Sequence, residues 1–449
     1  MRSILNNNLF NINFISSFIL IFFLIALFYG PLLVNSYYII LFIIFTYKIY
    51  VKEIDFKIEL NLSLILQIIF CTYLVLNSFF LNNDLSLTYK SLFYFRFFFS
   101  VYMISKILNI NDDTLSFISL IFLLCSLLLS IDILYQSQNG IDFFGFEASL
   151  CRYPNGSNEI DPNLCERFSG FFGKELIAGN FLSTYGLFFL YLFFYNVKKT
   201  FLNKCIIFFS FILILTSIII SGERNSFLSV LIILFLNFLF NKKLRKYIFL
   251  LILLFSFILT LAIKNFPHIQ HRYIDWPISN ISSHKGNLLK KLMQTPWGNH
   301  YLIAYEIFNE NKIFGSGYKS FRIECKKPKY SFESLNKKYD LELTYSGCST
   351  HPHSMYLEIL LEIGIFGFLI LLITFYFLIV HPYFKRIKYI KEKETVIFTL
   401  SILIAILFPF RPTGSFTATI FATNIWFFVG FYLYFINKSN HKINKLNPK

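Results

Sequence analysis

The chain has 449 residues, of which 56% are hydrophobic and 15% are charged, and its mean hydropathy is +0.59. This composition excludes a soluble globular protein of that length. Long apolar runs between short basic clusters indicate a polytopic membrane protein instead. The formal net charge of +16 needs no nucleic-acid partner, because most of it lies in basic segments that flank the apolar runs.

About twelve apolar runs have the roughly 17–25 residues that a helix needs to cross a bilayer. They predict an all-α polytopic membrane protein of about twelve transmembrane helices with two long outer loops, the larger one partly helical. The first run has a single basic residue before it, Arg2, and no small-residue cleavage site after it, which favours a retained helix over a signal peptide. The runs are 13–29, 32–49, 60–80, 91–108, 114–136, 176–197, 205–221, 226–241, 247–264, 352–380, 395–410 and 416–436.

The distribution of Lys and Arg predicts the orientation, because cytoplasmic loops carry the excess of positive charge. Threading twelve spans from a cytoplasmic N-terminus puts NKKLRKY (241–247), KRIKYIKEKE (385–394) and the Lys-bearing C-terminal tail inside. Both termini are then cytoplasmic. The predicted parts are 1–136 (N-terminal helices), 137–175 (first outer loop), 176–264 (central helices with a short outer turn at 221–226), 265–351 (large outer loop) and 352–449 (C-terminal helices and tail).

Four of the seven cysteines fall in the two long outer loops: Cys151 and Cys165 in the first, Cys325 and Cys348 in the second. Paired cysteines confined to outer loops indicate an oxidising compartment and one disulfide within each loop. Four unrelated thiols are the alternative.

The first outer loop ends in CERFSGFFGKELIAGNFLSTYG (165–186), where Arg167 and Lys174 stand among glycines just before an apolar run. Glycines allow a ligand to approach the backbone closely, and cations beside a helix N-terminus suit an anionic group. An ordinary re-entry turn with interfacial charges explains the pattern equally well.

The segment SGERNS (221–226) forms a very tight turn between two apolar runs. A short hairpin accounts for its glycine and polar residues, but not for Glu223 and Arg224 at the membrane boundary, where charges are costly unless used or paired. Arg is always charged and binds phosphate bidentately, so Arg224 is a candidate phosphate ligand.

The second outer loop contains WGNHYLIAYEIFNENKIFGSGYKSFRIEC (297–325). Its middle predicts a short amphipathic helix lying on the membrane surface. Its apolar residues are Leu302, Ala304, Ile307 and Phe308. The following Gly-Ser-Gly is a weak phosphate signal with no strand before it, which excludes a nucleotide-binding motif. His300 and Arg322 are secondary candidates for contacts with an anionic or sugar ligand.

The segment STHPHSMYLEILLEIGIFG (349–367) opens the next apolar run. Pro352 suits the first position of a helix, with Thr350 or His351 as its cap. His353 would then lie in the first turn, where the helix dipole disfavours imidazolium and keeps a base neutral. The same helix end would attract phosphate. His353 is therefore a candidate general base and His351 a secondary candidate.

Glu358 and Glu362 follow on one stripe of this run. Carboxylates at that depth are functional candidates, with helix pairing as the alternative. No outer cluster of Asp or Glu with ligand spacing accompanies the two histidines, so the sequence predicts neither a metal nor a cofactor.

Taken in order, RFSGFFGKELIAG, the SGERNS turn, AYEIFNENKIFGSGYKSF and HPHSMYLEILLEIGIFG resemble the O-antigen ligase family of bilayer glycosyltransferases. The resemblance covers roughly residues 165 to 380. It implies a metal-independent, inverting transfer of a glycan from undecaprenyl diphosphate to an acceptor sugar hydroxyl at the periplasmic face of the bacterial inner membrane. Carried onto this chain, it makes Arg224 a diphosphate ligand and His353 the base that deprotonates the acceptor.

The chain departs from the family pattern at two places. Ser354 follows His353 where the family has Asn, and His300 stands where family members often carry a second diphosphate-binding Arg. Arg322 and Arg167 are the candidates for the missing charge.

The leading hypothesis from the sequence is a ligase that transfers O-antigen to lipid A–core, in lipopolysaccharide biosynthesis. A polymerase with a lipid-linked glycan as acceptor would share the donor and the chemistry. A transporter or flippase of lipid-linked glycans would need internal repeats and a midplane pathway of charges, and the sequence suggests neither. A structural membrane protein whose loops only bind a partner is the fourth possibility.

Overall fold

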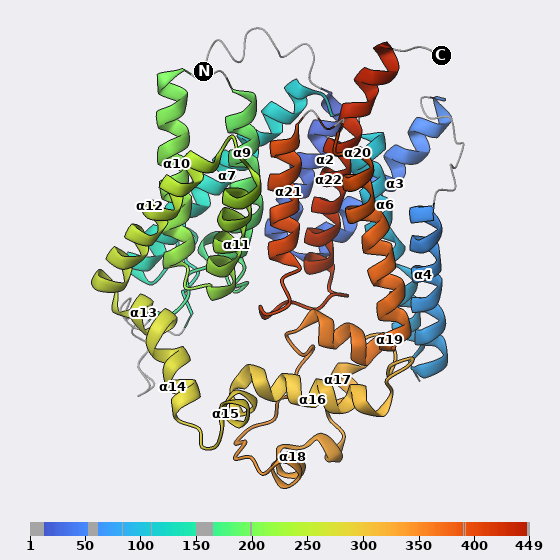
Figure 1. Cartoon of the computed structure of the whole chain (residues 1–449), viewed down its shortest axis with the longest axis vertical. Coiled ribbons are helices and arrows are strands. Elements are labelled where there is room, and N and C mark those ends of the chain that lie inside the picture. The colour runs from blue at the N-terminus through green and yellow to red at the C-terminus, as the bar shows by residue number, and fades with distance from the viewer. Residues whose placement is uncertain are drawn as a thin grey trace. The chain divides into compact units, whose positions relative to one another are not determined.

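The computed structural model describes residues 13–52, 62–82, 84–108, 110–149, 165–197, 200–388, 390 and 392–446. These residues are mainly helical, and they contain no strand beyond two isolated bridges. The chain divides into two compact units, each assembled from separate stretches of the sequence. The helices of both appear in Figure 1.

The first unit consists of residues 1–40, 108–277 and 392–407. Inside it, the Phe122 ring stacks on Phe189 at a centroid distance of 3.9 Å, and Asn237 donates to the Ser401 hydroxyl at 2.6 Å. Its helices are α2 (Phe14–Tyr29), α7 (Asp112–Asn139), η4 (Gly170–Phe172), α8 (Ala178–Phe181), η5 (Leu182–Gly186), α9 (Leu187–Asn196), α10 (Phe201–Ile220), α11 (Arg224–Phe240), α12 (Arg245–Asn265), α13 (Pro267–Gln270), η6 (His271–Asp275) and α21 (Lys393–Ile406).

The second unit consists of residues 41–107, 278–391 and 408–449. The buried Trp426 anchors its centre, donating to the Tyr94 hydroxyl at 3.2 Å and packing edge-on against Phe98. Its helices are α4 (Leu62–Leu81), α5 (Leu85–Leu92), α6 (Phe95–Tyr102), η2 (Met103–Ile107), α15 (Leu288–Gln294), α16 (Pro296–Glu310), α17 (Phe321–Glu324), η7 (Pro328–Tyr330), α18 (Phe332–Tyr339), α19 (Met355–Phe375), η8 (Tyr376–Val380), α20 (His381–Arg386) and α22 (Thr419–Leu446). The boundaries between the units fall within α3 (Pro31–Tyr50) and α14 (Trp276–Ser282).

Among the described residues, seven helices are long and apolar enough to cross a membrane, and α2 and α11 are shorter apolar helices. This confirms the all-α polytopic class. Within the described residues, every apolar run predicted from the sequence overlaps a helix, although 176–197 is broken into α8, η5 and α9 and 91–108 into parts of α5, α6 and η2. The number of spans, their orientation and the predicted parts of the chain stay predictions.

A backbone junction interrupts the long helix α19 at Gly364, whose φ is +68°. A Cβ at Gly364 would lie 2.1 Å from the Ile313 carbonyl oxygen, and a Cβ at Gly315 would lie 2.4 Å from that of Glu362. Only glycine lets the two backbones approach this closely. Ser316 and Gly317 donate their backbone N–H groups to the carbonyls of Leu361 and Glu362, and Ile365 and Phe366 donate to those of Lys312 and Ile313. The Gly-Ser-Gly turn is thus a structural insert that satisfies the groups freed by the break.

The amphipathic helix predicted in the large loop is present as α16, and its apolar residues pack against protein; that it lies on the membrane surface stays a prediction. Leu302, Ala304 and Ile307 are buried in a protein core with α17, α18 and the start of α19. Figure 1 shows α16 and α17 gathered at the N-terminal end of α19. The loop residues therefore supply enough apolar partners to cover this face themselves.

Candidate functional site

The Ser-Gly-Glu-Arg turn joins α10 to α11 and packs on the segment that follows the first loop. Gly222 adopts a φ of +69°, and a Cβ there would lie 2.3 Å from the Glu166 carbonyl oxygen. Phe168 donates its backbone N–H to the Ser221 carbonyl at 3.2 Å. The turn and the 165–170 segment are therefore one local structure, which brings Arg167 and Arg224 into the same part of the first unit.

The Glu223 carboxylate stabilises this turn through three hydrogen bonds. It accepts hydrogen bonds from the backbone N–H groups of Gly179 (3.0 Å) and Asn180 (3.1 Å) and from the Ser226 hydroxyl (3.0 Å). Burial raises the pKa of Glu223, while the Arg167 charge and these hydrogen bonds oppose the rise. The acidic residue at the predicted membrane boundary thus has a structural explanation.

Arg224 stands at the first position of α11 with its guanidinium 4.1 Å from the centre of the Trp276 ring. Among the described residues, no carboxylate or carbonyl accepts a hydrogen bond from it. Arg167 donates one hydrogen bond, from Nη2 to the Leu176 carbonyl at 3.1 Å, and its buried Nε has no partner in the described part of the chain. Both side chains keep donors available for an anion.

A third arginine, Arg272 in η6, lies against the same turn and was missed by the sequence analysis. Its Nε donates to the Gly222 carbonyl and its Nη1 to the Glu166 carboxylate, each at 3.2 Å. The pKa of Arg272 is lowered by burial and by the Arg167 charge, with Glu166 partly offsetting both. The sequence signal that could have indicated Arg272 is HRYIDW (271–276), in which a cation stands beside aromatic residues near the start of the large loop.

Arg167, Arg224 and Arg272 together are called the arginine group. One carboxylate in their vicinity, that of Glu166, pairs with one of them, and that of Glu223 is held by the turn. Guanidinium groups stay charged in proteins. The group therefore carries more positive charge than the two nearby carboxylates offset, and a ligand that bears phosphate would balance the excess. Lys174, the other cation predicted here, has an exposed side chain, and its role stays a prediction.

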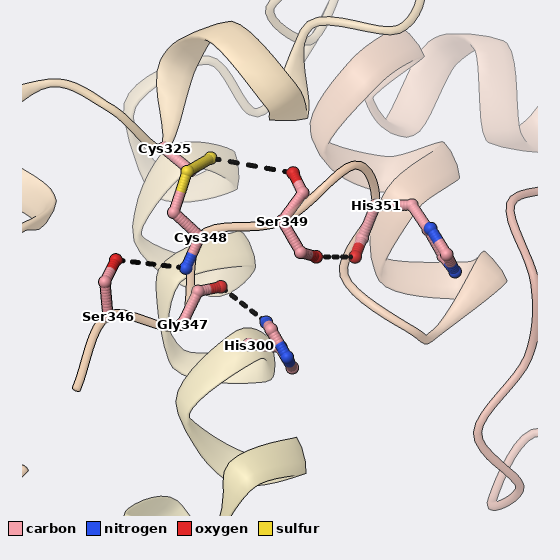
Figure 2. The surroundings of a disulfide bond; sticks show 7 residues. All are labelled: His300, Cys325, Ser346, Gly347, Cys348, Ser349 and His351. Atoms are coloured by element: carbon pink, nitrogen blue, oxygen red, sulfur yellow. Dashed lines mark hydrogen bonds between the residues drawn. A yellow bond between two sulfur atoms is a disulfide. The ribbon is translucent and has the colours of Figure 1, made fainter. Parts of the chain in front are cut away.

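The second unit holds the other candidate residues, on a segment fixed by a disulfide. Cys325 pairs with Cys348, as predicted. Figure 2 shows this bond beside His300, whose Nδ1 lies 2.5 Å from the Gly347 carbonyl oxygen. The disulfide and this contact tie down the chain just before His351. The other predicted pair stays a prediction, because Cys151 lies outside the described residues.

The position of His353 differs from the sequence-based expectation. The helix begins at Met355 with Ser354 as its cap, so Pro352 is not its first residue and His353 is not in its first turn. His353 has a φ of +56°, and its carbonyl accepts the Thr413 N–H at 2.8 Å. The Thr413 hydroxyl accepts the Met355 N–H at 2.7 Å. A distant loop thus stabilises a left-handed turn that local sequence rules do not foresee.

The rings of His300, His351 and His353 meet in one cluster, called the histidine group. The His353 ring centre lies 4.3 Å from that of His351 and 5.0 Å from those of His300 and Trp297. Burial, followed by the charges of His351 and His300, lowers the pKa of His353 to about 4. Burial likewise lowers the pKa of His351 to about 4, opposed by a hydrogen bond with Thr413. Both imidazoles are neutral at pH 7, which the sequence predicted for His353 alone, and burial rather than a helix dipole is the main cause.

The Nδ1 contact of His300 with a carbonyl oxygen places a proton on that nitrogen, because a carbonyl only accepts. Burial lowers the pKa of His300, and its hydrogen bond with Gly347 opposes this. Despite the clustered imidazoles, no group of three or more His, Cys, Asp or Glu side chains in the described ranges is arranged to hold a metal ion.

Glu358 and Glu362 are buried, and both connect α19 to loops of the second unit. Glu358 accepts the Ser415 hydroxyl at 2.5 Å and the Phe416 N–H at 2.7 Å. The Glu362 carboxylate accepts the backbone N–H of Lys319. These contacts give the two carboxylates a structural role, and a role in binding a ligand stays a prediction.

The comparison with protein families bears on both groups. Residues 209–372 match the model of the O-antigen ligase family. The chain carries an O-antigen ligase domain. The match runs from α10 through most of α19 and includes Arg224, Arg272 and the histidine group, whereas Arg167 lies before it. It confirms the resemblance drawn from the sequence motifs. A comparison with curated proteins finds no match.

The match supports a function of the O-antigen ligase or polymerase type, and that family implies lipid-linked glycan substrates. The ligase-family match covers the charged turn at the start of α11 and the segment before α19. The two groups belong to different compact units.

Proposed function

We propose that this O-antigen ligase family member transfers a glycan from undecaprenyl diphosphate to a sugar hydroxyl of lipid A–core, without a metal ion and with inversion at the anomeric carbon. The observation that carries the proposal is the arginine group. Three guanidinium groups gather at a turn in the family-matched region, and Arg224 has no acceptor among the described residues. A diphosphate that must be held and then released as a leaving group fits this excess of charge.

In the proposed reaction, His353 accepts the proton of the acceptor hydroxyl as that oxygen attacks the anomeric carbon. The bond from the anomeric carbon to the diphosphate oxygen breaks, and undecaprenyl diphosphate leaves with the bonding electrons. Arg167, Arg224 and Arg272 stabilise the negative charge on the leaving group. A base that is neutral at pH 7 is ready to accept the proton, and burial, followed by the neighbouring His351 and His300, lowers the pKa of His353 and so keeps it neutral.

The proposed topology keeps both termini in the cytoplasm and both long loops in the periplasm, with the protein in the bacterial inner membrane. The Cys325–Cys348 disulfide supports an oxidising compartment for the large loop. A polymerase that uses a lipid-linked glycan as acceptor is the alternative function, because it would need the same donor site and base.

The test uses the purified full chain in lipid, with an undecaprenyl-diphosphate oligosaccharide donor and lipid A–core as acceptor. We expect transfer that a chelator does not affect, and a loss of about 10²–10⁴-fold in His353→Ala, since general-base groups contribute that much. Arg224→Ala should fail as well, while Arg224→Lys should recover part of the activity because it keeps the charge.

Two results would change the conclusion. Elongation of the donor itself, with lipid A–core ignored, would make the protein a polymerase. Transfer at the wild-type rate in His353→Ala would remove that residue from the mechanism.

A further inference from the structure

Lys319 and Arg322 form a second cationic pair, separate from the arginine group and in the same unit as the histidine group. Arg322 lies on α17, directly before the disulfide-bonded Cys325. Its charge acts on His351 and on Lys319. Lys319 precedes α17 in a left-handed backbone conformation, with a φ of +59°. The pair therefore borders the segment that carries the candidate base.

The two cations lack strong protein partners. Neither forms a salt bridge or a side-chain hydrogen bond within the described part of the chain, and the Nε of Arg322 is buried without an acceptor there. Burial, followed by the Arg322 charge, lowers the pKa of Lys319. Two half-buried cations that repel one another are costly unless an anion joins them.

The neighbouring carboxylates offset part of this charge through space, but none accepts a hydrogen bond from the side chain of Lys319 or Arg322 within the described part of the chain. Glu358 is held by Ser415 and Phe416, and Glu362 by the backbone of Lys319, although both act on the cations through space. Glu324, on the same short helix as Arg322, pairs with Lys327 at 2.6 Å. The donors of Lys319 and Arg322 are thus left for an anion from outside the protein.

We infer that Lys319 and Arg322 bind an anionic group, a phosphate or a carboxylate, on the acceptor glycan beside the hydroxyl that His353 deprotonates. This rests on the proposed function for the identity of the acceptor. It also changes the role that the sequence resemblance suggested for Arg322, from a ligand of the donor diphosphate to a ligand of the acceptor. The arginine group already supplies three cations for the donor.

The experiment compares three synthetic acceptor glycolipids that are identical except for one substituent: a phosphate, a carboxylate or a neutral hydroxyl. Binding of each to the full chain in lipid is measured without donor, and transfer is then measured with donor. We expect an anionic acceptor to bind and to react about tenfold better than the neutral one, and the better of the two anions identifies the natural group.

Arg322→Gln and Lys319→Gln should each remove most of this preference, while leaving the binding of the neutral acceptor and the donor KM unchanged. Arg322→Lys should keep part of it. Lys326→Gln is the matched control. Lys326 directly follows Cys325 and its side chain is exposed, so its substitution should not change the preference for an anionic acceptor. A thermal unfolding curve for each variant checks that the fold is intact.

Equal binding of the three acceptors would overturn the inference, whether or not transfer occurs. A raised donor KM in Arg322→Gln would also overturn it and return Arg322 to the donor site. If no acceptor receives a glycan but the anionic one still binds about tenfold more tightly in wild type than in Arg322→Gln, the inference stands and the proposed function fails.

Discussion

The arginine group and the histidine group are both partly buried, and burial affects their chemistry in opposite ways. Guanidinium groups keep their charge, so Arg167, Arg224 and Arg272 stay cationic and can bind an anion at any physiological pH. The same kind of environment holds His351 and His353 neutral, with pKa values lowered to about 4. One group is therefore suited to holding charge and the other to accepting a proton. Such a division is what a transfer from a diphosphate to a hydroxyl requires.

The largest effect that tests this comparison is expected at Arg272, which the resemblance to the family did not indicate. Arg272→Gln should raise the KM for the undecaprenyl-diphosphate donor by about 10–100-fold, because a charge-assisted hydrogen bond to phosphate is lost. The KM for the acceptor should stay within about twofold, since the acceptor is assigned to the histidine group. Steady-state kinetics with each substrate varied in turn measures both.

Arg272→Lys is the control, because it keeps the charge and loses the bond to the Gly222 carbonyl. It should lie between wild type and Arg272→Gln. A change in the acceptor KM alone would contradict the assignment of Arg272 to the donor.

The pH dependence tests the other half of the comparison. Only the neutral form of His353 can accept a proton, so the rate should be nearly constant from pH 8 to about pH 5 and fall about tenfold per unit below pH 4. His351→Gln removes one charge that opposes protonation, so the midpoint should move upward. A wild-type midpoint near 6.5, the ordinary value, would show that His353 is not buried in the working enzyme.

The same shifts also predict the stability. Between about pH 4 and the ordinary histidine pKa, the unfolded chain binds protons that His351 and His353 in the folded chain do not. The free energy of unfolding should therefore fall as pH drops through this window. Thermal unfolding of His351→Gln should be less sensitive to pH there than that of wild type.

The smallest expected effect is at Trp276, which packs under the Arg224 guanidinium. Trp276→Leu removes a cation–π contact of about 0.5–1 kcal/mol, which corresponds to a rise of about two- to fivefold in the donor KM. Trp276→Phe should keep most of the interaction. An unchanged donor KM in Trp276→Leu would mean that the indole does not orient Arg224.

The fold class was predictable because length and hydropathy suffice to place apolar helices in a membrane protein. The turn at 221–226 and the Cys325–Cys348 pair were also predictable, since both depend on short-range signals in the sequence. The helix start at Met355 was not, because Thr413 determines it from a distant loop. Nor was Arg272, whose place depends on contacts with Gly222 and Glu166, 50 and 106 residues away in the chain.

The motif glycines show the same limit. From the sequence, Gly-Ser-Gly was only a weak phosphate signal, and no role was predicted for Gly364. The structure gives both a role in one backbone junction. Close backbone crossings leave no periodic signal, because neither partner contributes a side chain to the contact.

The junction between residues 312–317 and the break in α19 has a mechanical consequence. It joins the N-terminal part of α19 to the segment that connects α16 with α17. His300 lies on α16, and His353 directly precedes α19. We expect a tilt of that N-terminal part to move the segment after α16 with it, so that the histidine group moves together while the part of α19 beyond Gly364 bends at the break.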